Sequence, residues 1–398
     1  MINDPAGVKR VLVDNVANYP KTEFERQAFT GLFGTGLLGS DGELWREHRR
    51  IMAPSFHPSS VGAYAPAMTA ISAAFRARWD ERAGHMVDAA DEMSLLTLKI
   101  IAKTMFSSES KDAVDLIGRT MKQGFSATQF SLIDTLPIIG PAHMRRSELR
   151  LGEAFGAMGA VVSRFIAQRQ ANQDGGEADL LTRLLAARDE SGVQLTPKEI
   201  QDEVITIFIA GHETTAVAMA WIWYLLSQQP REEATLHAEL ARVLGGRPPR
   251  HEDLQSLTYT RRVVEEALRL YPPASGLATR VCMSDDEICG RKIAAGSNIV
   301  IAPFVMHHHP RLWNNPERFD PDRFSPDRIA ERHRFAYLPF GAGSRICIGQ
   351  LLAISELVII LATLAQTHRL HLAPSARVGF VQNITLRPRN LLMTVERR

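Results

Sequence analysis

The first two thirds of the chain are dominated by a helical spacing of apolar residues. Apolar positions recur at intervals of three and four over residues 58–80, 92–106, 109–128 and 147–170. This spacing is typical of helices that bury one face against a core. We therefore expect a set of packed helices in this part of the chain.

A longer helix is predicted from Thr196 to about Gln229. Thr196 can cap its start, with Pro197 at the first helical position and Glu199 at the capping-box position. At 1.5 Å per residue such a helix is roughly 45 Å long. Its middle is apolar on nearly every side, which predicts burial all round. Polar residues inside it therefore need a chemical reason.

The pattern changes after residue 271 to short β-like runs separated by Gly and Pro, such as residues 287–289 and 298–301. A last helix is expected from about Ile348 to Gln366, followed by a closing pair of strands. No internal repeat and no linker between domains is visible. We expect residues 1–398 to form a single domain, mainly α with a small β-rich region.

Composition narrows the class of protein. Of the 398 residues, 45% are hydrophobic and 23% are charged, and the net charge is +2. These values are typical of a globular chain and give no reason to expect nucleic acid as a partner. No run of eighteen apolar residues and no signal segment is present, so we expect a cytoplasmic protein without a membrane span.

The chain has three cysteines, Cys282, Cys289 and Cys347, which lack the spacing of a zinc knuckle or a redox pair. An odd and sparse set indicates a reducing compartment. We expect Cys282 and Cys289 to be buried as small hydrophobic residues.

Cys347 stands where a Gly-rich loop meets the start of the last predicted helix. A thiolate at a helix N-terminus has a lowered pKa and suits a metal, and haem iron is one such metal. Gly343 and Gly349 would let the backbone approach a flat macrocycle. Arg345 offers a cation for a haem propionate, and Phe340 can pack beside the sulfur.

These positions match the haem-binding signature FxxGxRxCxG of the cytochrome P-450 family, which the chain resembles. Five fixed residues would match by chance with odds below about one in 10^4. The resemblance implies that family's fold, in which haem b lies between a long central helix and the helix that follows Cys347. It implies that the sulfur of Cys347 ligates the haem iron.

A second signature of the family, ExxR, is present as Glu266 and Arg269, which share one helix face. Alone it is weak, because most such pairs are solvated surface contacts. The segment 313–324 resembles the family's meander, whose arginine completes a Glu-Arg-Arg triad that braces the haem loop. The better register makes that arginine Arg323, although the literal motif contains Arg318, which we expect to be exposed.

A third signature, A-G-x-[DE]-T-T, matches residues 210–215 in the middle of the long helix. A zinc protease is excluded, because its HExxH motif needs a histidine where Ala216 stands. Gly211 and a Thr214 hydroxyl bonded back to a carbonyl would instead open a groove for a flat cofactor. By resemblance, Glu213 and Thr214 relay protons during the cleavage of O2.

Trp45 and Arg49 lie one helical turn apart and could both reach a propionate. The family's WxxxR pattern binds one, and Arg280 occupies another propionate-binding position of the family. Without the resemblance, all three would be surface or packing groups. We expect His48 to lie beside Trp45 without touching iron.

Residues 307–309 are three consecutive histidines, which raises the possibility of a metal site. They fall where related sequences carry an HRDP loop, so we favour a surface turn. The apolar loop 136–141 has two open interpretations, a mobile lid or a buried crossover.

The resemblance implies a largely apolar substrate pocket, which favours a lipophilic small molecule. Its expected lining is the following set: Phe29 to Leu38, the surroundings of Phe125 and Phe130, Phe208 to Thr214, Ala274 to Leu277, and Gln382 to Ile384.

The match to the family begins near Val8. Family members usually have some tens of residues before the helix that Val8–Val16 resembles. By this resemblance the chain is short at its N-terminus, where family members carry a segment that contributes to the outer wall of the substrate channel.

The resemblance implies a haem-thiolate monooxygenase that inserts one atom of O2 into a C–H bond. No reductase is fused to the chain, so two electrons would come, ultimately from NAD(P)H, through a ferredoxin or flavodoxin docked where Arg334 and Arg345 cluster. Two alternatives are a peroxide-driven peroxygenase or isomerase, and a non-catalytic haem carrier. The Glu213–Thr214 pair argues against peroxide use.

Overall fold

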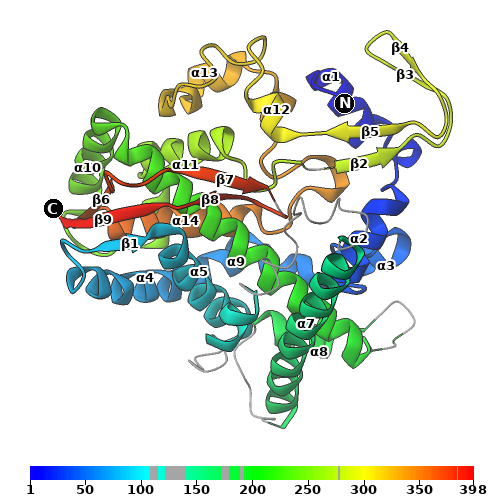
Figure 1. The fold of residues 1–398 in the computed structure, drawn as a ribbon, viewed down its shortest axis with the longest axis horizontal. Coiled ribbons are helices and arrows are strands. Elements are labelled where there is room, and N and C mark those ends of the chain that lie inside the picture. The colour runs from blue at the N-terminus through cyan, green and yellow to red at the C-terminus, as the bar shows by residue number, and fades with distance from the viewer. Residues whose placement is uncertain are drawn as a thin grey trace.

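The computed structural model describes residues 1–107, 115–121, 140–171, 179–188, 192, 194–276, 278–382 and 384–398. Helices form most of this part of the chain (Figure 1). The α-helices are α1 (Pro5–Lys9), α2 (Glu23–Phe33), α3 (Gly42–Met52), α4 (Pro58–Asp80), α5 (Ala89–Phe106), α7 (Gly140–Ala171), α8 (Leu180–Ala186), α9 (Pro197–Ser227), α10 (Pro230–Leu244), α11 (Thr258–Leu270), α12 (Pro303–His307), α13 (Pro326–Glu331) and α14 (Gln350–Leu364).

Short antiparallel strands form the β-rich minority. They are β1 (Met86–Asp88), β2 (Ala278–Val281), β3 (Asp286–Ile288), β4 (Arg291–Ile293), β5 (Asn298–Ile301), β6 (His368–Leu372), β7 (Gly379–Gln382), β8 (Leu386–Arg389) and β9 (Leu392–Arg397). One sheet has the order β1-β9-β6, and the other strands pair as β2-β5, β3-β4 and β7-β8. The predicted fold class, mainly α with a small β-rich region, is confirmed.

Helix α9 runs through the middle of the molecule (Figure 1). The predicted capping box is present, with the Thr196 side chain accepting from the Glu199 amide and the Glu199 carboxylate accepting from the Thr196 amide. The helix packs against α5, α7, α11 and α14. Among the described residues it is long and apolar enough to cross a membrane, but most of it is buried inside the protein. It is therefore the helix around which the others are arranged.

Aromatic side chains join α9 to its neighbours in the largest hydrophobic cluster. The rings of Phe208 on α9 and Phe106 on α5 are stacked with centroids 4.3 Å apart. Trp223 meets Trp79 of α4 edge to face at 5.5 Å. These contacts bury large apolar surfaces, and they fix the position of α9 at both ends of its central part.

The other predicted helices are found with small shifts in their ends. The range 58–80 is confirmed by α4, whereas α5 starts before residue 92 because Asp88 caps its first turn. Residues 115–121 are helical within the predicted range 109–128, and the rest of that range lies outside the described residues. Most of the loop 136–141 also lies outside them.

The N-terminal segment is held onto the β3-β4 hairpin by Asp286. Its carboxylate accepts from Arg10 at 2.6 and 3.2 Å, from Asn15 at 3.0 Å and from the Tyr19 hydroxyl at 2.7 Å. The pKa of Asp286 is lowered, first by the hydrogen bond from Arg10. This charge-assisted cluster connects the two parts of the chain.

The two cysteines outside the Gly-rich loop differ from each other. Cys282 is buried, as expected, and its thiol donates to the carbonyl of Ser284 at 3.0 Å. Cys289 is exposed, so the prediction of burial is wrong for it. It occupies the β3-β4 turn with φ +49°, and such tight turns lie at the surface.

Candidate active site

Cys347 lies between a tight turn and the start of α14. Its amide donates to the carbonyl of Phe340 at 2.9 Å, which closes the loop between these two residues. The side chain of Cys347 is exposed on one side and surrounded by protein on the others. This partial burial raises the pKa of the thiol. The Gly349 amide and the Arg49 guanidinium act in the opposite direction with smaller effect.

The expected lowering of the pKa of Cys347 is therefore wrong for the protein alone. Desolvation of the thiolate outweighs the favourable field of the helix N-terminus. A metal that binds this sulfur must displace its proton, and metal binding at cysteine is coupled to such a loss.

Glycine has different surroundings at positions 343 and 349. Gly343 has φ +73°, and a Cβ there would lie 1.9 Å from the carbonyl oxygen of Leu12. Its role is thus close contact with the N-terminal segment rather than with a macrocycle. A Cβ at Gly349 would lie 4.0 Å from the sulfur of Cys347 and 3.8 Å from Phe56. Gly349 thus borders the sulfur directly.

The structure brings together the three residues expected to form a triad. Arg269 donates to both oxygens of Glu266 at 2.7 and 2.9 Å, and Arg323 donates to the same carboxylate at 3.3 Å. The side chains of Glu266 and Arg269 are fully buried. Arg318, in contrast, has an exposed side chain, which confirms the choice of register.

His307 belongs to this cluster, and the sequence did not indicate it. Its Nδ1 lies 3.1 Å from the carbonyl oxygen of Arg269, and its Nε2 accepts from the amide of Leu338 at 2.9 Å. The carbonyl of His307 accepts from the Arg269 guanidinium at 2.8 Å. Burial lowers the pKa of His307 to about 3, so the ring is neutral.

The prediction of a surface turn is wrong for His307. It is fully buried at the end of α12, where it satisfies two backbone groups that would otherwise lack partners. It thereby links the Arg269 end of α11 to the segment that leads to Cys347. The described residues contain no group of three or more His, Cys, Asp or Glu that could hold a metal ion.

The middle of α9 is buried except at three positions. Between Asp202 and Trp223, Ala210, Gly211 and Thr214 alone are partly accessible. The hydroxyl of Thr214 donates to the carbonyl of Ala210 at 2.6 Å, as expected for a back-bonded threonine. This gap in the burial of α9 is where the third signature falls.

Gly211 makes room for a neighbouring helix. A Cβ there would lie 2.7 Å from the Cδ1 atom of Ile101 on α5. The contact with Ile101 thus explains the missing side chain of Gly211, and the expected contact with a cofactor does not. The backbone of Gly211 nevertheless lies at the accessible gap of α9.

Glu213 is buried and points toward strand β8. Its carboxylate accepts from the Thr385 hydroxyl at 3.1 Å and from Arg387 at 3.3 and 3.4 Å. The other guanidinium nitrogen of Arg387 donates to Asp91 at 3.2 Å. Burial raises the pKa of Glu213, and Arg387 opposes this shift. Arg387 and Thr385 carry no sequence motif, so the sequence analysis missed them.

The residues expected to bind propionates gather beside the cysteine loop. The guanidinium of Arg345 lies 4.3 Å from the ring centroid of Trp45, and that of Arg49 lies 5.6 Å from it. Arg49 also donates to the carbonyl of Ile346 at 2.8 Å, and Arg345 forms an ion pair with Asp41. Trp45 is therefore a platform between two cations.

Two further cations adjoin this group. Arg280 is buried and pairs with Glu25 at 3.2 Å. Lys21, which the sequence analysis missed, is also buried, and burial followed by repulsion from Arg345 lowers its pKa to about 8. With Arg49 and Arg345, four cations stand against the two carboxylates of Glu25 and Asp41. The excess positive charge suits the two carboxylates of a haem.

His48 lies in α3 beside Trp45, buried against α9. Its Nδ1 is 2.6 Å from a carboxylate oxygen of Glu203. His48 is therefore bonded to a side chain of α9, which is what we expect of a histidine that does not ligate iron.

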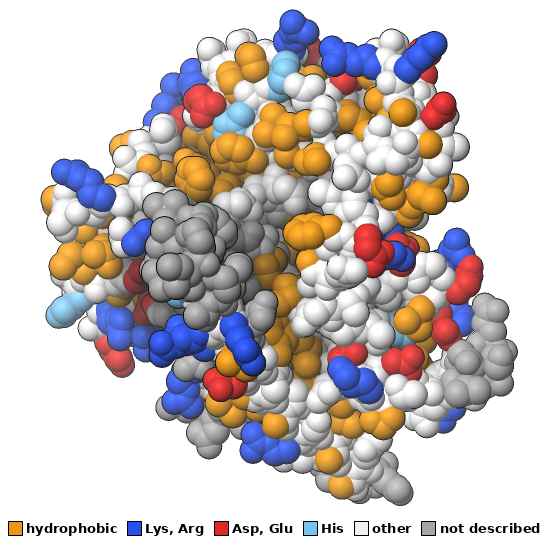
Figure 2. Space-filling model, turned by 45° about the vertical axis from the view of Figure 1, so that its right-hand side comes forward, with side chains coloured by type: hydrophobic (Ala, Val, Ile, Leu, Met, Phe, Trp, Pro, Cys, Tyr) orange, Lys and Arg blue, Asp and Glu red, His pale blue; other side chains and the backbone are white. Residues whose placement is uncertain are grey.

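Figure 2 shows hydrophobic side chains gathered around a hollow in one face, on the side where α2 and α7 lie in Figure 1. Of the predicted lining, Phe125, Phe130 and Leu277 lie outside the described residues.

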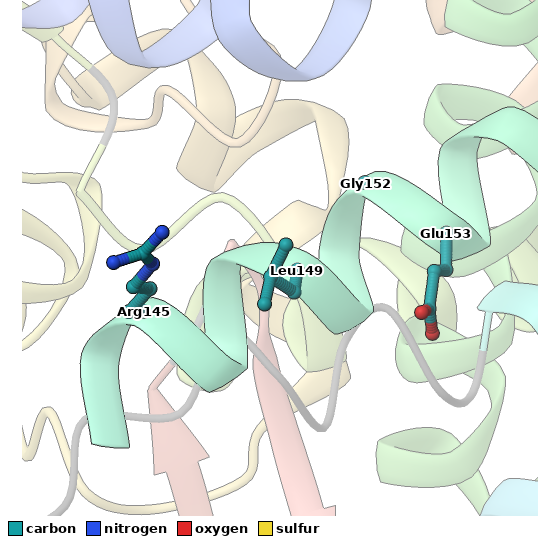
Figure 3. Close-up of a pocket in the computed structure, with 4 residues that line it drawn as sticks. All are labelled: Arg145, Leu149, Gly152 and Glu153. Carbon is teal, nitrogen blue, oxygen red and sulfur yellow. The ribbon is translucent and has the colours of Figure 1, made fainter. Parts of the chain in front are cut away.

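An open cavity of about 530 Å³ lies beside α7 (Figure 3). Arg145, Leu149, Gly152 and Glu153 line it. None of these belongs to the groups around Cys347 or the gap in α9.

An accessible cysteine sulfur beside excess cations, together with an alcohol at the gap in a buried helix, fits the haem-thiolate class of proteins. The sequence profile of the cytochrome P-450 family matches residues 1–395, and the chain belongs to this family. The family implies the use of haem and O2, and the protein is an oxidoreductase of the monooxygenase type.

Curated relatives agree with this assignment. The chain is 36% identical to cyclooctatin synthase of Streptomyces melanosporofaciens over 94% of its length and 81% of the relative's. It is 36% identical to pentalenene oxygenase of Streptomyces avermitilis over 92% and 80% of the two lengths.

A crystal structure of a cytochrome P-450 haem domain superposes with a TM-score of 0.89 at 27% identity. The superposition covers all of this chain and 87% of that one. The fold is thus that of the family.

Proposed function

We propose that the chain binds haem b through Cys347 and hydroxylates a C–H bond of a lipophilic small molecule. The observation that carries this proposal is the accessible sulfur of Cys347 beside four cations and only two carboxylates. Arg345, Arg49, Trp45 and Arg280 would hold the propionates. Phe340 and Gly349 would pack beside the sulfur.

When bound, the haem supplies the reductive activation of O2. Thr214 holds a hydroxyl proton at the gap in α9, where its bond to Ala210 orients the Oγ1 atom. Glu213 is the nearest acid along the helix, and Arg387 and Asp91 connect it to the partly exposed surface. We propose that Glu213 and Thr214 pass protons inward, while Arg387 holds the Glu213 carboxylate in place.

Two electrons would come from a ferredoxin or flavodoxin, ultimately from NAD(P)H. Arg334 is exposed and can contribute to docking, whereas Arg345 is turned toward Trp45 and Asp41. The docking surface proposed from the sequence is therefore reduced to Arg334 and its surroundings. We also propose a single domain and a cytoplasmic location without nucleic acid as partner.

The substrate class follows from the relatives and from the apolar hollow in Figure 2. The name pentalenene oxygenase denotes a hydrocarbon substrate for that relative. We propose a hydrocarbon skeleton of similar size and low polarity for this chain.

The first test is thiolate ligation. The reduced protein with carbon monoxide should show a Soret band far to the red, and Cys347→Ala should abolish that band. Uptake of haem with unchanged bands in the variant would contradict the proposal.

The second test is the proton relay. Thr214→Ala should lower product per NADPH consumed by about tenfold, because general acid catalysis contributes factors of at least that size. Thr214→Ser should restore most of the yield. Unchanged coupling in Thr214→Ala would contradict the proton relay. Absence of product from the wild type would favour a carrier, and product from hydrogen peroxide at the rate seen with redox partners would favour a peroxygenase.

A further inference from the structure

The segment from Gly34 to Ser40 connects α2 to α3 and is pressed against α9. Gly34 has φ +59°, and a Cβ there would lie 2.1 Å from a carboxylate oxygen of Asp202. A Cβ at Gly36 would lie 2.2 Å from the hydroxyl oxygen of Thr206. Glycine is thus required at two positions so that this backbone can touch the helix.

Two neighbouring carboxylates of α9 hold the amides of this segment. Asp202 accepts from the amide of Thr35 at 3.0 Å and from its hydroxyl at 3.2 Å. Glu203 accepts from the amide of Leu37 at 3.1 Å. Both carboxylates are buried, so these charge-assisted bonds are shielded from water.

An ammonium group holds the carbonyls of the same segment. The buried Lys21 donates to the carbonyl of Leu38 at 2.7 Å and to that of Ser40 at 3.4 Å. Charged side chains therefore bind the amides of the segment Gly34–Ser40 on one side and its carbonyls on the other. These contacts favour one position of the backbone, because each charged group would lose its hydrogen bonds to the segment if the segment moved.

Glu203 also ties this arrangement to α3. Its second oxygen lies 2.6 Å from Nδ1 of His48, and both side chains are fully buried. His48 is one residue from Arg49 and one turn from Trp45, so the helix of the proposed propionate site is fixed to the same carboxylate.

The segment lies close to the gap in α9. Gly36 touches Thr206, which is one turn before Ala210, a rise of about 6 Å along the helix. Leu38, at the end of the segment, is a partly exposed apolar side chain that packs against the core. The segment can thus place an apolar wall beside the accessible part of α9.

We propose that Asp202 and Glu203 are positioning residues that determine substrate size, because they fix the segment Gly34–Ser40 as one wall of the pocket. This inference rests on the proposed function, since it requires that the substrate lie at the gap in α9. The two carboxylates act on the substrate through the segment and do not touch it.

The first experiment measures hydrogen exchange of the haem-loaded protein. Asp202→Ala and Glu203→Ala should each speed exchange of the amides of Thr35 and Leu37 by at least ~10-fold, because a hydrogen bond to a charged group is lost. Asp202→Asn and Glu203→Gln retain an acceptor oxygen and should show a smaller increase.

The second experiment compares affinities for hydrocarbons that range in size from benzene to pentalenene, read from the shift of the haem spectrum. Glu203→Ala should change the ratio of large to small ligand affinities by about tenfold, since a difference of 1.4 kcal/mol is a factor of ten. The carbon monoxide band should stay in place.

Glu239 provides a matched control. It is a buried carboxylate that accepts from the amides of Tyr259 at 2.7 Å and Thr260 at 2.8 Å, far along the chain from the segment. Glu239→Ala should speed exchange of those two amides and leave the ranking of ligands unchanged.

Unchanged protection of Thr35 and Leu37 would overturn the proposal, and so would faster exchange with an unchanged ranking. If the alanine variants do not fold, the Asn and Gln variants give the same two readings. A wild-type protein without a haem band would refute the proposed function instead, while the exchange rates would still test the hold on the segment.

Discussion

Two groups of charged side chains near Cys347 differ in how completely the protein satisfies them. In the first, Glu266, Arg269 and Arg323 are buried, and their charges meet one another and backbone carbonyls. In the second, Arg345 keeps part of its surface accessible beside the open sulfur of Cys347.

The difference separates a scaffold from a binding site. In a closed cluster every charge already has a partner. Removal of one residue leaves an ion buried without that partner, and this lowers the stability of the folded state. An open cluster with four cations and two carboxylates is completed by an added dianion. We therefore propose that the cluster around Glu266 holds the fold together, whereas the cluster around Arg345 would retain the cofactor.

The largest effect is expected from Arg269→Leu, which leaves the buried carboxylate of Glu266 with only Arg323 and the amide of Asp320 as partners. The free energy of unfolding in urea should fall by about 3 to 5 kcal/mol. Arg262→Leu removes a surface pair with Asp322 and should cost under about 1 kcal/mol. Similar losses in the two variants would remove the distinction between a closed cluster and an ordinary surface pair.

A smaller effect is expected from Arg345→Leu, which removes one cation of the open cluster. Haem should leave the protein about 10 to 100 times faster, because a hydrogen bond to a charged group contributes about 1.5 to 3 kcal/mol. Transfer of haem to apomyoglobin measures this rate. Arg247→Leu, in a surface pair with Asp253, is the control. An unchanged rate in Arg345→Leu would argue against the propionate role.

The smallest effect, counted per pH unit, is expected from the titration of His307, which closes the first cluster. Its folded pKa of about 3 lies below the unfolded value of about 6.5, so the unfolded chain binds more protons between these values. Stability should therefore fall as the pH falls from 6.5 toward 3. The free energy of unfolding of His307→Gln should fall less steeply with falling pH than that of the wild type. The difference between the two slopes should be about 1.4 kcal/mol per pH unit.

His309→Gln is the matched control for that slope, because His309 is partly exposed and bonds a neighbouring amide. If the free energy of unfolding falls with the same slope against pH in the wild type and in His307→Gln, the fold does not hold the ring of His307 neutral.

Local rules predicted much of the fold. The start of α9 follows from Thr196, Pro197 and Glu199, which act within one turn. This feature needs only residues close in sequence, and this is why the sequence shows it. The choice of Arg323 over Arg318 came instead from the resemblance of the segment to the family's meander, and the contact with Glu266 agrees with it.

Features that depend on distant contacts were missed or mistaken. His307 is buried because α11 and Leu338 need partners, and neither is adjacent to it in sequence. Lys21 and Arg387 carry no motif. The pKa of Cys347 was predicted from the helix start alone, whereas the packing of remote segments around the sulfur decides its direction.

The three openings in the burial of α9 limit how this enzyme can be redesigned. Most substitutions along that helix would disturb packing before they reached a bound molecule. Of the three open positions, Thr214 has a proposed chemical role and Gly211 has Ile101 against it. Ala210 is the position on this helix at which a larger side chain could reshape the cavity, so directed evolution of new activities should begin there and in flanking loops.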